Sequence, residues 1–255
     1  MERVVCIIQA RMGSSRLPGK VLKDIGGKPM LGWVVERVRQ CKKIDQVVVA
    51  TTSDAGDDPI VEFCRDHSIG CFRGDVFDVL DRYYQAAREY KADVVVRVTA
   101  DCPLIDPAVV DRAIAELQEK KLDFTANRLP PPFKRTYPIG LDVEVASMAA
   151  LSEAWKNATE QHEREHVMPY LYAGQRKFKT GVIDAPQDYG SQRWTVDTPE
   201  DLEFLRGIAR LLDGRMDFTW EEILKLVQAH PELSTLNATV QHKFMKDVDD
   251  RAEKK

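Results

Sequence analysis

The chain has 255 residues, of which 44% are hydrophobic and 31% charged, a composition typical of a soluble globular protein with one main domain. Its 37 Lys and Arg residues against 41 Asp and Glu residues leave a net charge of −4, which argues against a nucleic-acid partner. Its 14 Gly and 13 Pro exclude a collagen-like or low-complexity chain. No stretch approaches the roughly 18 apolar residues that span a membrane, so we expect no membrane partner either.

Five cysteines are scattered along the chain without a Cys-x-x-Cys pair: Cys6, Cys41, Cys64, Cys71 and Cys102. This pattern fits neither a disulfide framework nor a zinc site, and it suits a reducing compartment. The apolar run near the N-terminus has no export cleavage pattern and is followed at once by Arg11. We therefore expect a cytoplasmic protein.

In the first half of the chain, strand-like and helix-like patterns alternate. Predicted strands cover 4–8, 47–49, 71–72 and 93–99, and predicted helices cover 30–41, 57–67, 77–90 and 106–120. Apolar strands separated by helices predict the α/β class, with a mostly parallel sheet covered by helices on both faces. Such sheets bind ligands beyond the carboxyl ends of their strands, here the loops 9–20 and 99–107.

The pattern changes after Asn127. Three prolines at 130–132 break the chain, and 137–147 alternates like an exposed strand. The remaining predicted elements are a helix at 161–172, strands at 178–183 and 192–195, and helices at 199–212 and 220–228. We predict a single domain over 1–245 with an excursion at about 128–175, followed by a charged tail at 246–255.

The strongest motif is the loop after the first predicted strand. It brings together three cations, Arg11, Arg16 and Lys20, and two glycines, Gly13 and Gly19. Glycines let backbone N–H groups approach an anion, and cationic side chains add charge-assisted hydrogen bonds to phosphate oxygens. The spacing departs from that of a P-loop, which weakens an ATPase interpretation. A solvated basic turn is the less favoured alternative.

Two aspartates are candidates for a metal site. Asp101 follows a buried strand, where a carboxylate is well placed to hold Mg²⁺ against substrate phosphates. Asp106, directly before Pro107, is better explained as a helix N-cap. Asp197 precedes a helix start in which Thr198 is the expected cap. On these residues alone, a metal role for Asp197 and a favourable charge at the helix start are equally supported.

The motif Gly140-Leu141-Asp142-Val143-Glu144 is ambiguous. Asp142 and Glu144 would share one strand face, where they could pair with Lys134 or Arg135, bind a metal or meet a polar substrate; a solvated face is the simplest interpretation. His166 is a lone histidine on a helix, for which surface or interface packing is favoured over catalysis.

Together these motifs resemble the cytidylyltransferases that activate acidic sugars, a family that includes the CMP-sialate and CMP-KDO synthetases and, closest in pattern, the branch of spore-coat polysaccharide biosynthesis protein F. The resemblance rests on Ile7–Lys20, Thr99–Pro103, Gly140–Val145 and Val196–Leu202. It implies a Rossmann-like nucleotidyltransferase fold, often dimeric through an excursion like the one here, so a homodimer is expected.

The resemblance also implies roles for individual residues. Those expected at the nucleotide are Ala10, Arg11, Gly13, Ser14, Ser15, Arg16, Lys20 and, with the weakest match, Arg82. Arg16 and Lys20 would be catalytic, and Asp101 and Asp197 would hold Mg²⁺. Ser15-Arg16-Leu17-Pro18 departs from the usual sialate-synthetase sequence, so the acceptor need not be a nonulosonate.

The expected reaction is Mg²⁺-dependent transfer of CMP from CTP to a small acidic or phosphorylated sugar or polyol, with release of pyrophosphate, in surface polysaccharide biosynthesis. Two alternatives remain open. One is a glycosyltransferase that uses a nucleotide-sugar donor, with Asp142 and Glu144 as its acid pair. The other is a non-catalytic nucleotide-binding protein.

Overall fold

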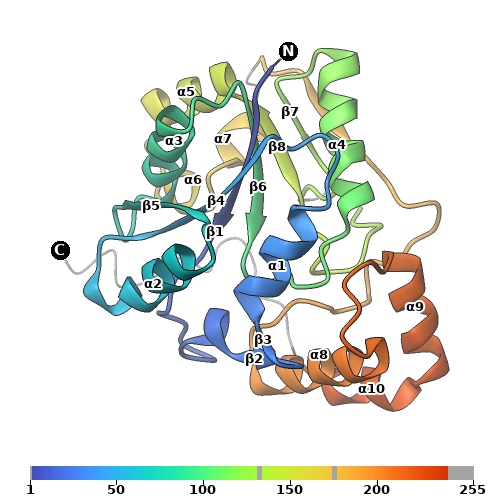
Figure 1. The fold of residues 1–255 in the computed structure, drawn as a ribbon. Coiled ribbons are helices and arrows are strands. Elements are labelled where there is room, and N and C mark those ends of the chain that lie inside the picture. The colour runs from blue at the N-terminus through green and yellow to red at the C-terminus, as the bar shows by residue number, and fades with distance from the viewer. Residues whose placement is uncertain (1, 131–133, 174–176, 241–255) are drawn as a thin grey trace.

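The computed structural model describes residues 2–130, 134–173 and 177–240. Its centre is a seven-stranded sheet in the order β5-β4-β1-β6-β8-β7-β9. Its strands are β1 (Val4–Gln9), β4 (Gln46–Thr52), β5 (Gly70–Gly74), β6 (Val94–Thr99), β7 (Phe124–Ala126), β8 (Glu144–Ser147) and β9 (Thr180–Val182). Six strands are parallel, and β8 is antiparallel to both of its neighbours (Figure 1). A separate hairpin pairs β2 (Asp24–Ile25) with β3 (Lys28–Pro29).

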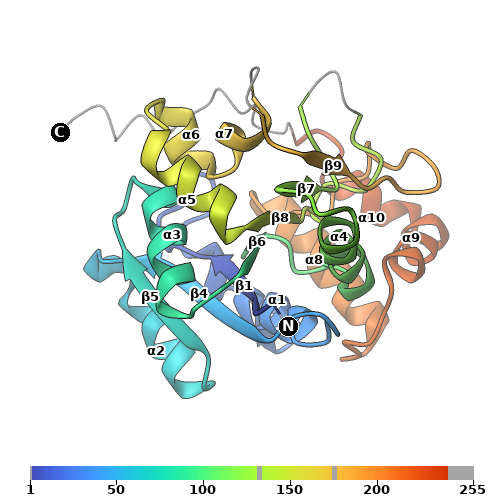
Figure 2. The same ribbon diagram turned by 90° about the horizontal axis from the view of Figure 1, so that it is seen from above.

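Helices cover both faces of this sheet (Figure 2). Alternate residues of β1 point to opposite sides, so Cys6 and Ile8 enter one hydrophobic core while Val5 and Ile7 enter the other. The first core is covered by α1 (Met30–Val38), α2 (Asp58–Asp66), α4 (Pro107–Lys120), α8 (Pro199–Leu212), α9 (Trp220–Ala229) and α10 (Pro231–Leu236). The second is covered by α3 (Val79–Glu89), α5 (Met148–Asn157) and α7 (Pro169–Tyr172), and α6 (Gln161–His166) packs against α3.

The predicted α/β class, with a mostly parallel sheet and helices on both faces, is confirmed. Each predicted element of the first half is present, with its ends moved by a few residues. Two short 3₁₀ helices, η1 (Lys20–Leu22) and η2 (Ala55–Asp57), lie in the connections. Because β1, β4 and β6 are parallel neighbours, the loops that follow them meet at one edge of the sheet.

The prediction of an exposed strand over 137–147 is wrong. Only Glu144–Ser147 forms a strand, and it lies inside the sheet between β6 and β7. Val145 and Ala146 are fully buried, in different cores. In the sequence, the charge of Glu144 suggests a solvent-facing position. The side chain can be buried because Arg97 on β6 neutralises its charge.

Other departures are smaller. The helix predicted over 161–172 is interrupted at Val167, whose φ of 71° is incompatible with a right-handed helix. The strand predicted at 192–195 is reduced to a single bridge between Ile139 and Arg193. The elements β7, α5 and α10 were not predicted from the sequence.

The segment 128–175 contributes β8 to the sheet, and its helices α5 and α6 pack against α3. The prolines 131–132 and the tail 246–255 lie outside the described residues. Within the described part of the chain, no helix has the length and apolar character needed to cross a bilayer.

Candidate active site

The loop after β1 folds back on itself at the carboxyl edge of the sheet. The carbonyl of Met12 accepts hydrogen bonds from the backbone N–H groups of Ser14, at 3.0 Å, and Gly19, at 2.9 Å. Gly19 has a φ of +67°, a conformation that glycine adopts without strain, and η1 begins directly after it. The side chains of Arg16 and Lys20, which this turn carries, both reach the carboxylate of Asp197.

Asp57 anchors this loop from a different part of the chain. One of its carboxylate oxygens accepts a hydrogen bond from the Met12 N–H at 2.7 Å, and the other accepts from the N–H and hydroxyl of Thr52. The side chain is only 4% exposed. Its position before Pro59 indicated only a helix start in the sequence, so this anchoring role was missed.

The ammonium of Lys20 lies between the two predicted metal ligands. It donates to Asp101 Oδ2 at 2.8 Å, to Asp197 Oδ1 at 2.9 Å and to the carbonyl of Val196 at 2.8 Å. Burial alone would lower the pKa of Lys20, but the two carboxylates outweigh it and raise that pKa above its ordinary 10.5. Lys20 is therefore a buried, fully charged group at neutral pH.

Asp101 and Asp197 come together because their backbones are joined. The Val196 N–H donates to the Asp101 carbonyl at 2.9 Å, and the Thr195 hydroxyl donates to the same oxygen at 3.0 Å. The hydroxyl of Thr99, at the end of β6, donates to Asp101 Oδ1 at 2.6 Å. The structure thus brings together two aspartates that are distant in the sequence.

Asp197 is surrounded by three cations. Besides Lys20, Arg16 contacts its Oδ2 at 2.9 Å and Arg193 contacts the same oxygen at 3.0 Å. Burial would raise the pKa of Asp197, but Lys20, Arg16 and Arg193 together hold it well below its usual value of 3.8. Arg193 was not singled out from the sequence; a bridge to Ile139 and an ion pair with Asp201 place it here.

A buried carboxylate, Asp201, fixes the orientation of this segment. It is 0% exposed and accepts hydrogen bonds from Arg193, from the N–H groups of Asp197 and Thr198, and from the side chain of Asn237. Thr198 caps α8 as predicted and forms a reciprocal capping box with Asp201. The helix start therefore also positions the Asp197 carboxylate.

The oxygens around Lys20 Nζ suit a divalent cation. Two carboxylates and one backbone carbonyl converge on a single positive charge, and these are hard oxygen donors of the kind Mg²⁺ prefers. Among the described residues, no group of three or more His, Cys, Asp or Glu side chains could hold a metal. The donor set thus fits an ion that takes its remaining ligands from phosphates and water, not an all-protein cage.

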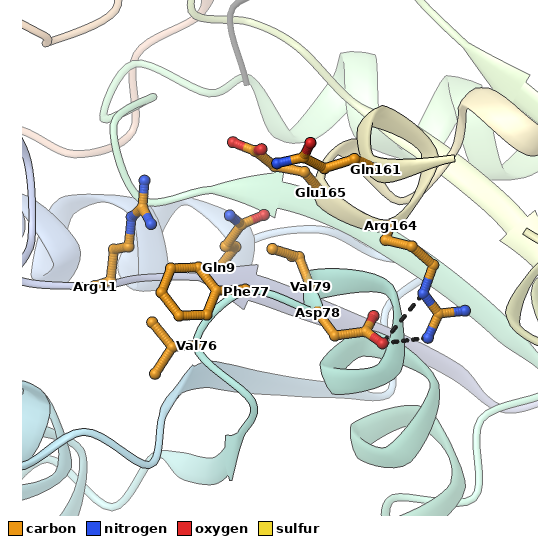
Figure 3. A pocket seen from close by; sticks show the side chains of 9 residues that line it. All are labelled: Gln9, Arg11, Val76, Phe77, Asp78, Val79, Gln161, Arg164 and Glu165. Atoms are coloured by element: carbon orange, nitrogen blue, oxygen red, sulfur yellow. Dashed lines mark hydrogen bonds and ion pairs between the residues drawn. The ribbon is translucent and has the colours of Figure 1, made fainter. Parts of the chain in front are cut away.

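A pocket of about 210 Å³ opens at the end of β1, between the loop before α3 and helix α6 (Figure 3). Figure 3 shows Arg11 on one side and Arg164, ion-paired with Asp78, on the other. The pocket is lined by Gln9, Arg11, Val76, Phe77, Asp78, Val79, Gln161, Arg164 and Glu165. It combines apolar walls with amide and guanidinium groups, as small-molecule sites do.

The other predicted nucleotide-site residues lie in or behind the loop. Ala10 is buried at the end of β1, Ser14 is half-buried, and Gly13 and Ser15 are exposed. Arg82 is 0% exposed, and its guanidinium donates to the carbonyls of Asp75 and Val76. In this state Arg82 supports the pocket wall from behind, and direct contact with a nucleotide remains a prediction.

Comparison with known proteins identifies the family. The sequence model of the cytidylyltransferase family matches residues 5–242, nearly the whole chain. This protein is a member of the cytidylyltransferase family. It is 31% identical over 242 residues to spore coat polysaccharide biosynthesis protein SpsF of Bacillus subtilis, a match that covers 92% of this chain and 98% of that protein.

Solved structures agree with the assignment. A cytidylyltransferase from Leptospira borgpetersenii superposes with a TM-score of 0.86 at 33% identity, covering 95% of this chain and 100% of that one. A CMP:2-keto-3-deoxy-manno-octonic acid synthetase in complex with CTP superposes with a TM-score of 0.61 at 20% identity, covering 82% and 99%. At that identity the second match shows the shared fold. The predicted family and fold are confirmed.

In this cytidylyltransferase, both acidic side chains of the 140–144 motif form ion pairs with arginines. Asp142 accepts from Arg135, one of the two partners considered from the sequence, at 3.0 Å through Nη2. Glu144 pairs with Arg97, and its 4% exposure rules out the solvated face. Neither carboxylate contacts the Lys20 ammonium, whose three acceptors belong to Asp101, Val196 and Asp197.

Two further predictions have simple outcomes. Asp106 caps α4 as predicted, since its side chain accepts from the N–H groups of Ala108 and Val109, and it also accepts from Trp220 at 2.8 Å. His166 is half-buried as the last residue of α6.

Proposed function

We propose that this cytidylyltransferase catalyses Mg²⁺-dependent transfer of CMP from CTP to a sugar acid or a phosphorylated sugar or polyol. An acceptor oxygen attacks the α-phosphorus, the bond from that phosphorus to the bridging oxygen breaks, and pyrophosphate leaves. The observation that carries the proposal is the convergence of Lys20, Asp101 and Asp197 beside the folded loop after β1.

The residues of the loop would hold the triphosphate by charge and geometry. Arg16 and Lys20 would neutralise the negative charge that builds on the departing pyrophosphate, and the glycines would let backbone N–H groups approach phosphate oxygens. Asp101 and Asp197 would hold Mg²⁺, which supplies Lewis-acid stabilisation of phosphate oxygens when bound. Such catalysis depends on positioning and electrostatics, with little covalent chemistry by the protein.

The pocket beside Arg11 is the best place for the nucleoside. It adjoins the loop through Gln9 and Arg11, so a nucleoside there would extend its phosphates over the loop toward Asp101. Phe77 offers an apolar wall for a base, while Gln9 and Gln161 offer amide groups that can read its edge. The preference for CTP is supported by the family and by the related synthetase crystallised with CTP.

The acceptor and the pathway are proposed from the relatives. The similarity to SpsF supports a role in surface polysaccharide biosynthesis. We also propose that the enzyme is a homodimer and works in the cytoplasm, where its five free cysteines would stay reduced.

A pyrophosphate-release assay tests the reaction. The purified protein is incubated with Mg²⁺, each of the four nucleoside triphosphates in turn, and a panel of sugar acids and phosphorylated polyols, with pyrophosphatase and malachite green as the readout. We expect acceptor-dependent pyrophosphate release with CTP and its loss in Asp101→Asn. Binding of CTP without turnover on any acceptor would support the non-catalytic alternative.

The glycosyltransferase alternative is less favoured, because Asp142 and Glu144 are already paired with arginines. The products distinguish the two reactions. A cytidylyltransferase releases pyrophosphate from CTP, whereas a glycosyltransferase would release a nucleoside diphosphate from a nucleotide sugar.

A further inference from the structure

The contacts of Lys20 conflict with its expected role on the triphosphate. An ammonium has three hydrogens, and the Lys20 ammonium donates to three acceptors, which are Asp101, Asp197 and the Val196 carbonyl. No donor is left for a phosphate oxygen. If Lys20 binds a nucleotide, at least one of these bonds must break first.

The same ammonium occupies the position that suits a metal ion. The carboxylates of Asp101 and Asp197, 96 residues apart in the sequence, converge on it at 2.8 and 2.9 Å, and the Lys20 side chain is only 11% exposed. Without a cation between them, two partly buried carboxylates would repel each other, and each would lose its principal counter-charge. In this state the Lys20 ammonium therefore neutralises the two carboxylates, as a bound metal ion would.

We propose that Lys20 is a resident cation that is exchanged for the metal when the nucleotide binds. In the free enzyme Lys20 pairs with both Asp101 and Asp197. When the metal–nucleotide complex binds, the ammonium leaves these carboxylates and moves to the phosphates. This inference rests on the proposed metal role of the two aspartates. Its consequence is that the free enzyme binds divalent metal poorly, so that metal and nucleotide bind together.

The contacts of Arg16 and Arg193 are consistent with this exchange of Lys20 for a metal ion. Both stay in contact with Asp197 Oδ2, whereas Lys20 contacts Oδ1. Departure of Lys20 would therefore free Asp101 Oδ2 and Asp197 Oδ1 for a metal while Asp197 keeps two guanidinium partners. The arginines hold the carboxylate in place, and the flexible lysine is the group that moves.

The test measures Mn²⁺ binding by electron paramagnetic resonance, in which free Mn²⁺ gives the signal, on the whole protein without nucleotide. In Lys20→Met the competing charge is removed, so we expect Mn²⁺ to bind at least about tenfold more tightly than in the wild type. Lys28→Met removes another ion-paired lysine, the partner of Glu36, and should bind Mn²⁺ like the wild type. If Lys20→Met does not fold, Lys20→Gln replaces it, since its amide can still donate to one carboxylate.

The outcomes separate this inference from the proposed function. Equal Mn²⁺ affinity of the wild type and Lys20→Met without nucleotide, with Mn²⁺ binding lost in Asp101→Asn, would overturn the exchange and leave the metal site intact. Failure of every variant to bind Mn²⁺, with or without the non-hydrolysable α,β-methylene analogue of CTP, would overturn the metal site itself. The exchange also predicts that the analogue raises the Mn²⁺ affinity of the wild type more than that of Lys20→Met.

Discussion

Arg16 places a guanidinium against one of the two proposed metal ligands. Its guanidinium lies 2.9 Å from Asp197 Oδ2 and is 29% exposed, so it faces both the carboxylate and the space beside the loop. A donor fixed in this way stabilises developing charge without reorganising during the reaction. The catalytic contribution of the loop should therefore depend on single side chains.

Replacement of Arg16 by alanine should lower kcat/KM for CTP by about 10²- to 10³-fold, which corresponds to about 2.7–4 kcal/mol. Arg39→Ala is the matched control, because the Arg39 side chain is exposed and donates to the Ser68 carbonyl, away from the site. Steady-state kinetics with pyrophosphate detection measure both. Near-normal turnover in Arg16→Ala would count against the assignment.

The charge on Asp197 should make its contribution to stability independent of pH near neutrality. Its pKa in the folded protein lies well below the ordinary 3.8, so the stabilisation is fully present above about pH 5 and is lost as the pH falls toward the folded value. Urea unfolding of the wild type and Asp197→Asn should give a constant difference from pH 5 to 8 and a smaller one below pH 4. A difference that changes between pH 6 and 8 would be inconsistent with this pKa.

At the scale of elements, connections between distant segments position the site. The loop after β1 is held by Asp57 before α2, and the segment before α8 is held by Asp201 inside that helix. Both carboxylates are buried, and each accepts hydrogen bonds from two backbone N–H groups. Each should therefore affect catalysis without touching a substrate.

Asp57→Asn tests the anchor of the loop. Asparagine has one accepting oxygen where Asp57 uses two, so a buried donor of Met12 or Thr52 loses its partner at a cost of about 1–3 kcal/mol and the loop shifts. We expect kcat/KM for CTP to fall by about tenfold to a hundredfold. The neighbouring Asp58→Asn, which removes only an exposed pair with Arg73, should leave the kinetics unchanged.

Asp201→Ala tests the support of Asp197. It removes the partner of a buried arginine and should lower the free energy of unfolding by about 3–5 kcal/mol. Glu203→Ala, on the same helix and in a surface pair with Arg206, should cost about 0–1 kcal/mol. Chemical denaturation measures both, and equal effects of the two substitutions would show that the Asp201 network is not a stabilising unit.

At the scale of the whole molecule, the site is an assembly of segments from both ends of the chain. Lys20 donates to the Val196 carbonyl across 176 residues, because the sheet brings the ends of β1 and β6 together and α8 starts beside them. The order β4-β1-β6 is what allows this meeting.

This arrangement explains which parts could be predicted from the sequence. The loop cations, Asp101 and Asp197 stand in local motifs with a chemical meaning of their own, so they could be identified. Asp57 accepts from Met12, which lies 45 residues earlier, so its anchoring role does not show in its local sequence. Arg193 and Asp201 pair with each other eight residues apart, but their local sequences indicate only a strand and a helix start. The burial of Glu144 could not be predicted because period-two alternation does not show whether a neighbouring strand supplies an arginine.

A crystal structure of the enzyme soaked with Mn²⁺ and the α,β-methylene analogue of CTP would show directly where metal, phosphates and Lys20 lie. We predict an anomalous manganese peak between Asp101 and Asp197, phosphates on the loop at Arg16, and the Lys20 ammonium moved from the carboxylates to a phosphate oxygen. A manganese peak elsewhere, or phosphates bound away from this loop, would contradict this prediction.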